Sequence, residues 1–110
     1  MDKRKLMRVL DYLHEQLEES GIRVSRIILF GSQVKKTAVN DSDIDVVIVS
    51  DNFRRKDLWK RTEMLKSPVV NTIDKFIVPL DVIPMTCEEL ESEGSIIAGY
   101  ARKGVVVFAA

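Results

Sequence analysis

The segment from Leu29 to Val49, LFGSQVKKTAVNDSDIDVVIV, carries the strongest signals in this sequence. A Gly31-Ser32 pair ends one apolar run, and ten residues later an Asp43-x-Asp45 pair opens the next. The second run continues as VVIV, which is typical of a buried strand because it is apolar and β-branched. Side chains alternate faces along a strand, so the two carboxylates point the same way from Cα atoms about 7 Å apart.

These paired carboxylates favour a metal site. Two carboxylates on one face repel each other unless a cation lies between them, and Mg²⁺ prefers such oxygen ligands. An ordinary polar turn before a strand would explain Asp41 and Ser42 equally well. It explains Asp45 poorly, because that residue lies inside the apolar run. We therefore predict a metal site at the mouth of this strand, with a polar turn as the alternative.

Two other motifs fail at fixed positions. An EF-hand loop over these aspartates would need Gly and Glu where the chain has Val46 and Asn52. A P-loop beginning at Gly31 would need Gly and Lys where the chain has Lys36 and Thr37. Neither a calcium loop of that type nor a P-loop is therefore expected.

The Gly31-Ser32 pair, the ten-residue spacing and the Asp43-x-Asp45 pair together resemble the signature of the DNA polymerase β type of nucleotidyltransferase. The segment Ser42-Asp43-Ile44-Asp45-Val46 looks like the short form found in minimal nucleotidyltransferases, many of which are antitoxins paired with an all-helical HEPN protein. The resemblance extends from about Val24 to Phe108. The chain departs from the family pattern at Gln33, where members often carry Arg, and at Lys36, where they often carry a small residue.

A third carboxylate is expected from another strand. Asp81 lies between Leu80 and Val82, where a lone carboxylate is costly unless it is paired. In the family that this chain resembles, a carboxylate from a neighbouring strand completes the metal site, and the resemblance assigns that role to Asp81. Asp74 is a weaker candidate, since it precedes the strand.

The resemblance also implies a reaction. Asp43, Asp45 and Asp81 would hold two Mg²⁺ ions, for which Mn²⁺ could substitute, and Gly31 and Ser32 would bind the phosphates of ATP or another nucleoside triphosphate. Glycine permits a sharp turn, and free N–H groups at the start of the next turn suit a phosphate. The expected product is a nucleotidyl group, AMP, on a hydroxyl of a HEPN-type partner. The alternative is an inactive nucleotidyltransferase-like module that neutralises a partner by contact, which the departures at Gln33 and Lys36 favour.

Composition restricts the class of protein. The 110 residues suit a single domain, residues 1–110. Lys plus Arg and Asp plus Glu both number 17, so no overall basic charge argues for nucleic-acid binding. One cysteine excludes an internal disulfide, and no stretch reaches transmembrane length. These features favour a cytoplasmic protein without a membrane partner, and they leave homo- or hetero-oligomers open.

Periodicity and turn residues predict an α/β fold, a mixed sheet of about four strands with helices packed against it. Leucines at helical spacing give the first helix one apolar stripe. The predicted helices cover residues 2–19, 53–66, 87–92 and 95–103, the predicted strands cover residues 24–30, 43–50 and 105–108 with one more within 75–85, and residues 32–36 and 37–42 are expected to form a short helix and a loop.

Several local details follow from this assignment. We expect Asp51-Asn52 to cap the helix over residues 53–66, Ser67-Pro68 to end it, and Leu58, Thr62 and Leu65 to face inward. Its many Lys and Arg side chains favour a solvated outer face over a rim that attracts phosphates.

Near the C-terminus, Thr86 and Glu89 predict a capping box. Ile96, Ile97 and Tyr100 are expected to turn inward from the helix over residues 95–103. Pro79 predicts a bulge or an edge position in the third strand, because it cannot donate a hydrogen bond.

Overall fold

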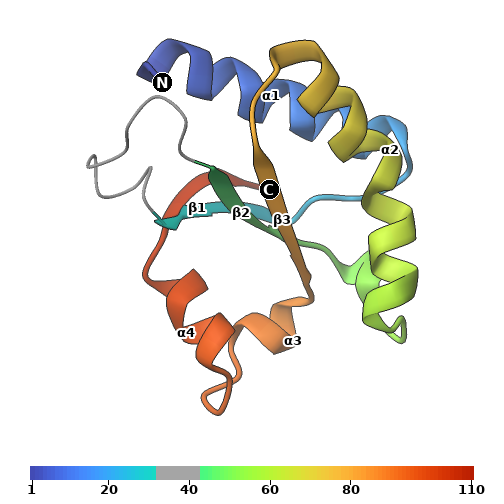
Figure 1. Ribbon diagram of the computed structural model, residues 1–110. Coiled ribbons are helices and arrows are strands. Elements are labelled where there is room, and N and C mark those ends of the chain that lie inside the picture. The colour runs from blue at the N-terminus through green and yellow to red at the C-terminus, as the bar shows by residue number, and fades with distance from the viewer. Residues whose placement is uncertain (32–42) are drawn as a thin grey trace.

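The computed structural model describes residues 1–31 and 43–110, so the helix and loop predicted within residues 32–42 lie outside the described part of the chain. The strands assemble into one sheet, and helices lie on both sides of it (Figure 1). The elements in chain order are α1 Lys3–Glu19, β1 Arg26–Phe30, β2 Ile44–Val49, the 3₁₀ helix η2 Asp51–Phe53, α2 Leu58–Phe76, β3 Leu80–Met85, α3 Cys87–Leu90, α4 Ile96–Arg102 and β4 Val105–Ala109.

The sheet has four strands in the order β3-β2-β1-β4. Strand β1 runs antiparallel to both β2 and β4, whereas β2 and β3 are parallel. The predicted mixed sheet is therefore confirmed. Strands β3 and β4 form its two edges.

Each face of the sheet packs against a different pair of helices. Figure 1 shows α1 and α2 together on one side and the shorter α3 and α4 on the other. We call these the α1/α2 face and the α3/α4 face. Alternation along β2 sends Ile44, Val46 and Ile48 into the core under α1 and α2, and sends Val47 and Val49 toward α3 and α4.

Helix α1 agrees with its prediction. The side chain of Asp2 accepts a hydrogen bond from the Lys5 N–H at 2.8 Å and caps the first turn. The buried face is the predicted leucine stripe together with one valine, and consists of Val9, Leu10, Leu13 and Leu17. His14, on the same helix, packs against Phe108 with ring centroids 4.0 Å apart.

The prediction for the second long helix was wrong at both ends. Asp51 and Asn52 belong to η2, and the Asn52 side chain accepts a hydrogen bond from the Arg23 N–H at 2.7 Å, so it is engaged elsewhere. Asp57 caps α2 instead, through the Lys60 N–H at 2.9 Å. Leu58 is 70% exposed.

Thr62, predicted to face inward, is also exposed, whereas Leu65 is buried as predicted. Pro68 does not end α2, which continues to Phe76. A proline inside a helix costs about 3 kcal/mol. The turns beyond it recover that cost because Thr72 is fully buried and Phe76 packs edge-on against Tyr12 of α1 at 5.7 Å.

Because α2 is longer than predicted, β3 is shorter and begins at Leu80. Pro79 lies just before it, and its carbonyl accepts a hydrogen bond from the Ile44 N–H at 3.0 Å. Pro84 is the proline inside the strand, where it pairs with Ile48. It is tolerated because β3 is an edge strand, where a residue that cannot donate a backbone hydrogen bond can be accommodated.

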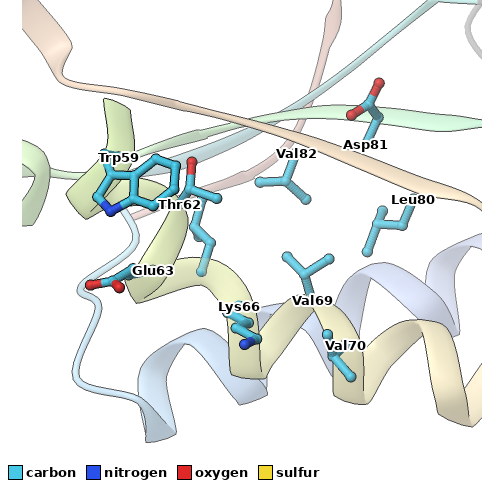
Figure 2. A pocket seen from close by; sticks show the side chains of 10 residues that line it. Trp59, Thr62, Glu63, Lys66, Val69, Val70, Leu80, Asp81 and Val82 are labelled. Carbon is cyan, nitrogen blue, oxygen red and sulfur yellow. The ribbon is translucent and has the colours of Figure 1, made fainter. Parts of the chain in front are cut away.

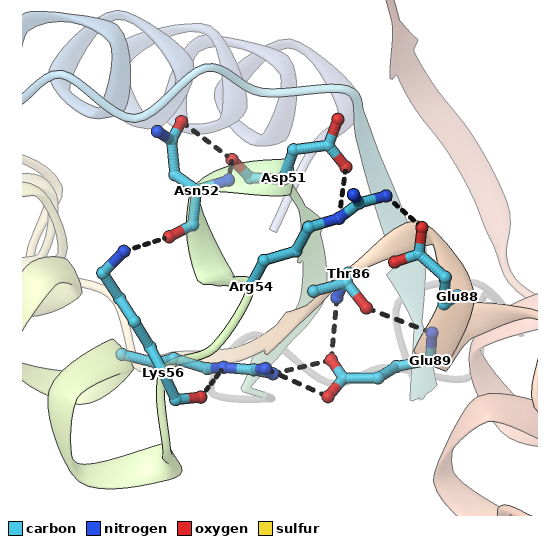
Figure 3. Close-up of polar contacts among 9 residues, drawn as sticks. Asp51, Asn52, Arg54, Lys56, Thr86, Glu88 and Glu89 are labelled. Atoms are coloured by element: carbon cyan, nitrogen blue, oxygen red, sulfur yellow. Dashed lines mark hydrogen bonds and ion pairs between the residues drawn. The ribbon is translucent and has the colours of Figure 1, made fainter.

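The predicted capping box at α3 is confirmed. Glu89 donates its backbone N–H to Thr86 Oγ1 at 3.2 Å, and its carboxylate accepts from the Thr86 N–H at 2.8 Å (Figure 3). The same carboxylate accepts two hydrogen bonds from Arg61 of α2, at 2.6 and 3.0 Å. Arg61 lowers the pKa of Glu89 through these bonds, and the Thr86 N–H adds to the effect. This network joins α2 to α3.

The inward side of α4 differs from the prediction. Ala98 and Ala101 are the residues that pack against the sheet, whereas Ile96, Ile97 and Tyr100 are 80%, 53% and 66% exposed. Alanines permit a close approach of the helix, and the larger side chains then project to either side. Within the described residues, no helix is long and apolar enough to cross a membrane.

Candidate functional site

Gly31 lies directly against the carboxylate of Asp45. Gly31 follows β1 with a φ of +81°, a conformation that glycine adopts at little cost. A Cβ atom added at this position would lie 2.5 Å from Asp45 Oδ2. The absence of a side chain at Gly31 is therefore what leaves room for the Asp45 carboxylate.

The sheet brings Asp45 and Asp81 together. They are direct partners in the parallel pairing of β2 and β3, so their side chains lie on the same face. Phe30 of β1 is the partner of Asp45 on the other side. Figure 2 shows the Asp81 carboxylate projecting away from α2, whereas Leu80 and Val82 lie between the strand and that helix. The carboxylates therefore belong to the α3/α4 face.

The charges in this group are coupled. The pKa of Asp45 is raised above 3.8, first by partial burial, then by the negative charge of Asp81 and then by that of Asp43. Asp43 and Asp81 are exposed, and Asp45 is half-buried. Asp45 therefore lies close enough to Asp43 and Asp81 for their charges to act on it. Asp74, the weaker candidate, lies in α2 on the opposite side of the sheet.

These carboxylates are suitable ligands for a hard divalent cation, but their present positions do not form a coordination site. In residues 1–31 and 43–110, no three His, Cys, Asp or Glu side chains are placed to hold a metal as they stand. The donor atoms are the type that Mg²⁺ prefers, and a cation would remove the repulsion that raises the pKa of Asp45. Ser32, the other predicted phosphate ligand, lies outside the described residues.

A hollow of about 570 Å³ adjoins Gly31 on the carboxylate side of the sheet. The sequence did not predict this hollow, because Ile97 and Tyr100 of α4 were expected to be buried core residues. The helix pattern carries one usable signal, the spacing of Ile97 and Tyr100 at i and i+3, which places both on one side of α4. Its lining comes from β1, β3 and α4, and comprises Phe30, Gly31, Ile83, Ile97, Tyr100, Lys103 and Gly104.

A second hollow, of about 440 Å³, lies between α2 and β3 (Figure 2). Trp59, Lys66 and Val69 line its α2 side, and Leu80 and Val82 line its strand side. Asp81 borders it but directs its carboxylate to the other face. This hollow is therefore separated by β3 from the carboxylate group.

Three basic residues of the η2–α2 segment, Arg54, Lys56 and Arg61, bind groups within the chain. Arg54 forms an ion pair with Glu88 and contacts Asp51 at 3.7 Å (Figure 3). Arg61 binds Glu89, and Lys56 Nζ donates to the Asn52 carbonyl at 2.8 Å. These pairings favour the prediction that the basic side of this segment is an outer face of the protein, rather than a rim of free cations that attracts phosphates.

Comparison with known proteins agrees with the fold. The sequence pattern of the nucleotidyltransferase domain family matches residues 6–104. A putative protein adenylyltransferase of Methanocaldococcus jannaschii, MJ1305, is 31% identical over 103 residues, which cover 90% of this chain and 69% of that protein.

Two solved structures share the fold. A putative nucleotidyltransferase from Sulfolobus solfataricus superposes with a TM-score of 0.58 at 18% identity, covering 99% of this chain and 90% of that one. A toxin-antitoxin crystal structure with AMP-PNP superposes with a TM-score of 0.63 at 17% identity, covering 100% and 75%. Because the family pattern spans nearly the whole chain, this protein belongs to the nucleotidyltransferase domain family.

Proposed function

We propose that this chain transfers AMP from ATP to a hydroxyl group on a partner protein, in a reaction that depends on Mg²⁺. One observation carries the proposal: Asp45 lies between Asp43 and Asp81 and against Gly31, so negative charge gathers where family members handle a nucleotide. The curated relative is named a protein adenylyltransferase, which supports a protein as the acceptor.

Each residue has a role in this proposal. Asp43, Asp45 and Asp81 would hold two Mg²⁺ ions, or Mn²⁺ in their place. Bound ions of this kind supply positive charge for the triphosphate and lower the pKa of an attacking hydroxyl. Gly31 would let the phosphates approach the backbone, and Ser32 would donate hydrogen bonds to them. Asp81, which is exposed, would accept the proton of the acceptor hydroxyl.

The acceptor we propose is a tyrosine hydroxyl on a small helical HEPN-type protein, which the transfer would inactivate, so that this chain acts as its antitoxin. The similar solved structure described as a toxin-antitoxin with AMP-PNP supports pairing with a partner and use of an adenine nucleotide. The pair would form a hetero-oligomer. We place the reaction in the cytoplasm, since the single cysteine suits a reducing compartment.

The test is the intact mass of the candidate partner after incubation with this protein, ATP and Mg²⁺. We expect gains of one or more AMP units, lost in Asp45→Asn and in the presence of a chelator. The matched control is Asp74→Asn, which removes a carboxylate from α2 on the other side of the sheet. If the partner is neutralised at constant mass, and equally well by Asp45→Asn, then the chain acts by contact and the transfer proposal is wrong.

A further inference from the structure

The hollow beside Gly31 exposes apolar and aromatic surface that the fold itself does not require. Tyr100 is 66% exposed and Ile97 is 53% exposed, although both side chains are large and apolar. They lie at i and i+3 of α4, so they share one side of the helix and line the hollow together. Phe30 and Ile83 supply apolar surface from the sheet. A small flat ligand would cover all four side chains.

The position of α4 is fixed by contacts that leave this surface open. Ala98 and Ala101 pack against the sheet. Arg102 Nη1 donates hydrogen bonds to the carbonyls of Leu90 at 2.6 Å and Ser92 at 3.1 Å. At Gly104, an added Cβ would lie 2.5 Å from the carbonyl oxygen of Leu29, so the end of α4 lies directly against β1. These contacts hold the α4 side of the hollow in place.

The hollow adjoins the carboxylate group at Gly31. Gly31 belongs to its lining and also lies against Asp45. Ile83 follows Asp81 by two residues on the same face of β3, which is about 7 Å along the strand. A molecule that reached from the carboxylates into the hollow would pass Gly31.

Charge favours a nucleotide over an acceptor side chain as the occupant. Lys103 is the one charged residue among the described residues that line the hollow. An ammonium group at the edge of an aromatic hollow matches a ligand that joins a flat base to phosphates. A tyrosine acceptor carries no such negative charge. The volume of about 570 Å³ is within the usual range for small-molecule sites.

We propose that this hollow binds the nucleoside of the nucleotide, with the base stacked on Tyr100 and Lys103 directed toward the phosphates. The inference rests on the proposed function, because it takes the triphosphate to lie at Asp43, Asp45 and Asp81. Tyr100 would be a binding residue that sets preference for a nucleoside. The carboxylates would hold the phosphates through bound Mg²⁺, whatever base the nucleotide carries.

The experiment compares two probes by calorimetry, Mg²⁺–ATP and Mg²⁺–tripolyphosphate, which lacks the nucleoside. Replacing Tyr100 with Ala should weaken ATP binding about tenfold, the size of effect that loss of one base–aromatic stack produces, and leave tripolyphosphate binding unchanged. Tyr100→Phe should bind ATP as the unmodified chain does, since it keeps the ring. The matched control is Trp59→Ala, which removes an exposed aromatic ring on α2, across the sheet.

Each outcome separates the inference from the proposed function. If ATP and tripolyphosphate bind the unmodified chain equally, or if Tyr100→Ala and Trp59→Ala bind ATP equally well, the nucleoside lies elsewhere and only the inference fails. If neither probe binds in the presence of Mg²⁺, both the inference and the proposed function are wrong. Because Tyr100 is mostly exposed, its variants should fold, which circular dichroism checks.

Discussion

The two faces of the sheet use the same strands for different purposes. The α1/α2 face is closed by two long helices, and it buries Val9, Leu13, Ile44, Val46 and Ile48 completely. In the described part of the chain, the α3/α4 face carries two short helices, and the end of the sheet beyond them presents carboxylates and a glycine. Alternation along β2 places Ile44 and Val46 on one face and Asp45 between them on the other. The α1/α2 face therefore carries the larger core, whereas the α3/α4 face combines a smaller core with the carboxylates and the hollow beside Gly31.

Charge repulsion gathers on the α3/α4 face. Asp45 has a raised pKa because of partial burial and two neighbouring carboxylates. Shifted pKa values are common at functional sites. If this comparison is right, substitutions on the two faces should separate function from stability, and the following variants test that separation in order of expected effect.

The largest effect should come from Asp45→Asn on transfer. Loss of the central carboxylate should reduce the rate by a factor of about a thousand or more, which corresponds to about 4 kcal/mol of transition-state stabilisation. The measurement is the rate at which partner mass increases, with Asp74→Asn as the control. A rate within about tenfold of the unmodified chain would show that the open face does not carry the reaction.

Leu13→Ala should affect stability instead. Leu13 is fully buried under the α1/α2 face, and truncation of a buried leucine costs about 3 kcal/mol of the free energy of unfolding. Urea denaturation measures this cost. Nucleotide affinity of the folded fraction should remain unchanged, and a loss of affinity as large as that of Asp45→Asn would show that the two faces are not independent.

Gly31→Ala should reduce both stability and nucleotide affinity. The substitution forces an alanine into a φ of +81° and brings its Cβ to 2.5 Å from Asp45 Oδ2, with a combined cost of about 2 kcal/mol. Gly21→Ala is a close control, because Gly21 has a φ of +85° but nothing within 4 Å of an added Cβ. Thermal unfolding of both variants isolates the clash with Asp45, and equal destabilisation would mean that the carboxylate simply moves away.

Glu89→Gln tests the link between the faces, since Glu89 of α3 binds Arg61 of α2. The folded-state pKa of Glu89 lies below 4.5, so its ionised form stabilises the fold above that pH, and the contribution is lost as the pH falls through the folded-state pKa. Because Glu89 is nearly half exposed, we expect a loss of about 1 kcal/mol or less at pH 7. The difference from the unmodified chain should disappear once the pH is well below the folded-state pKa. Urea denaturation at pH 7 and in acid measures it, and a difference that persists in acid would point to packing rather than charge.

The smallest effect is that of Asp45→Asn on stability without metal. The folded-state pKa of Asp45 lies above 3.8, so the folded chain retains the proton more strongly, and stability falls as the pH rises from 3.8 through that raised pKa. The amide variant lacks this penalty and should be slightly more stable at pH 7 and equal below 3.8. Thermal unfolding with a chelator measures the difference, and added Mg²⁺ should stabilise only the unmodified chain. A less stable variant at pH 7 would indicate a structural hydrogen bond that needs the carboxylate.

Three features could be predicted from the sequence, because local chemistry determines them. A carboxylate inside a β-branched run identified Asp45, leucine spacing identified the buried side of α1, and Thr86 with Glu89 identified the start of α3. In each case neighbouring residues in the chain provide the whole signal.

Other features were decided only by tertiary structure. The pairing of Asp45 with Asp81 depends on the register of two parallel strands, which no local pattern encodes. Helix α2 passes through Pro68 because its later turns are buried against α1, a long-range gain that exceeds the local cost of proline. Periodicity made Ile97 and Tyr100 look like core residues, since it reports which side of a helix is apolar but not what covers that side. The packing of Ala98 and Ala101 determines which side of α4 faces the sheet. The larger side chains of Ile97 and Tyr100 therefore line the hollow beside Gly31.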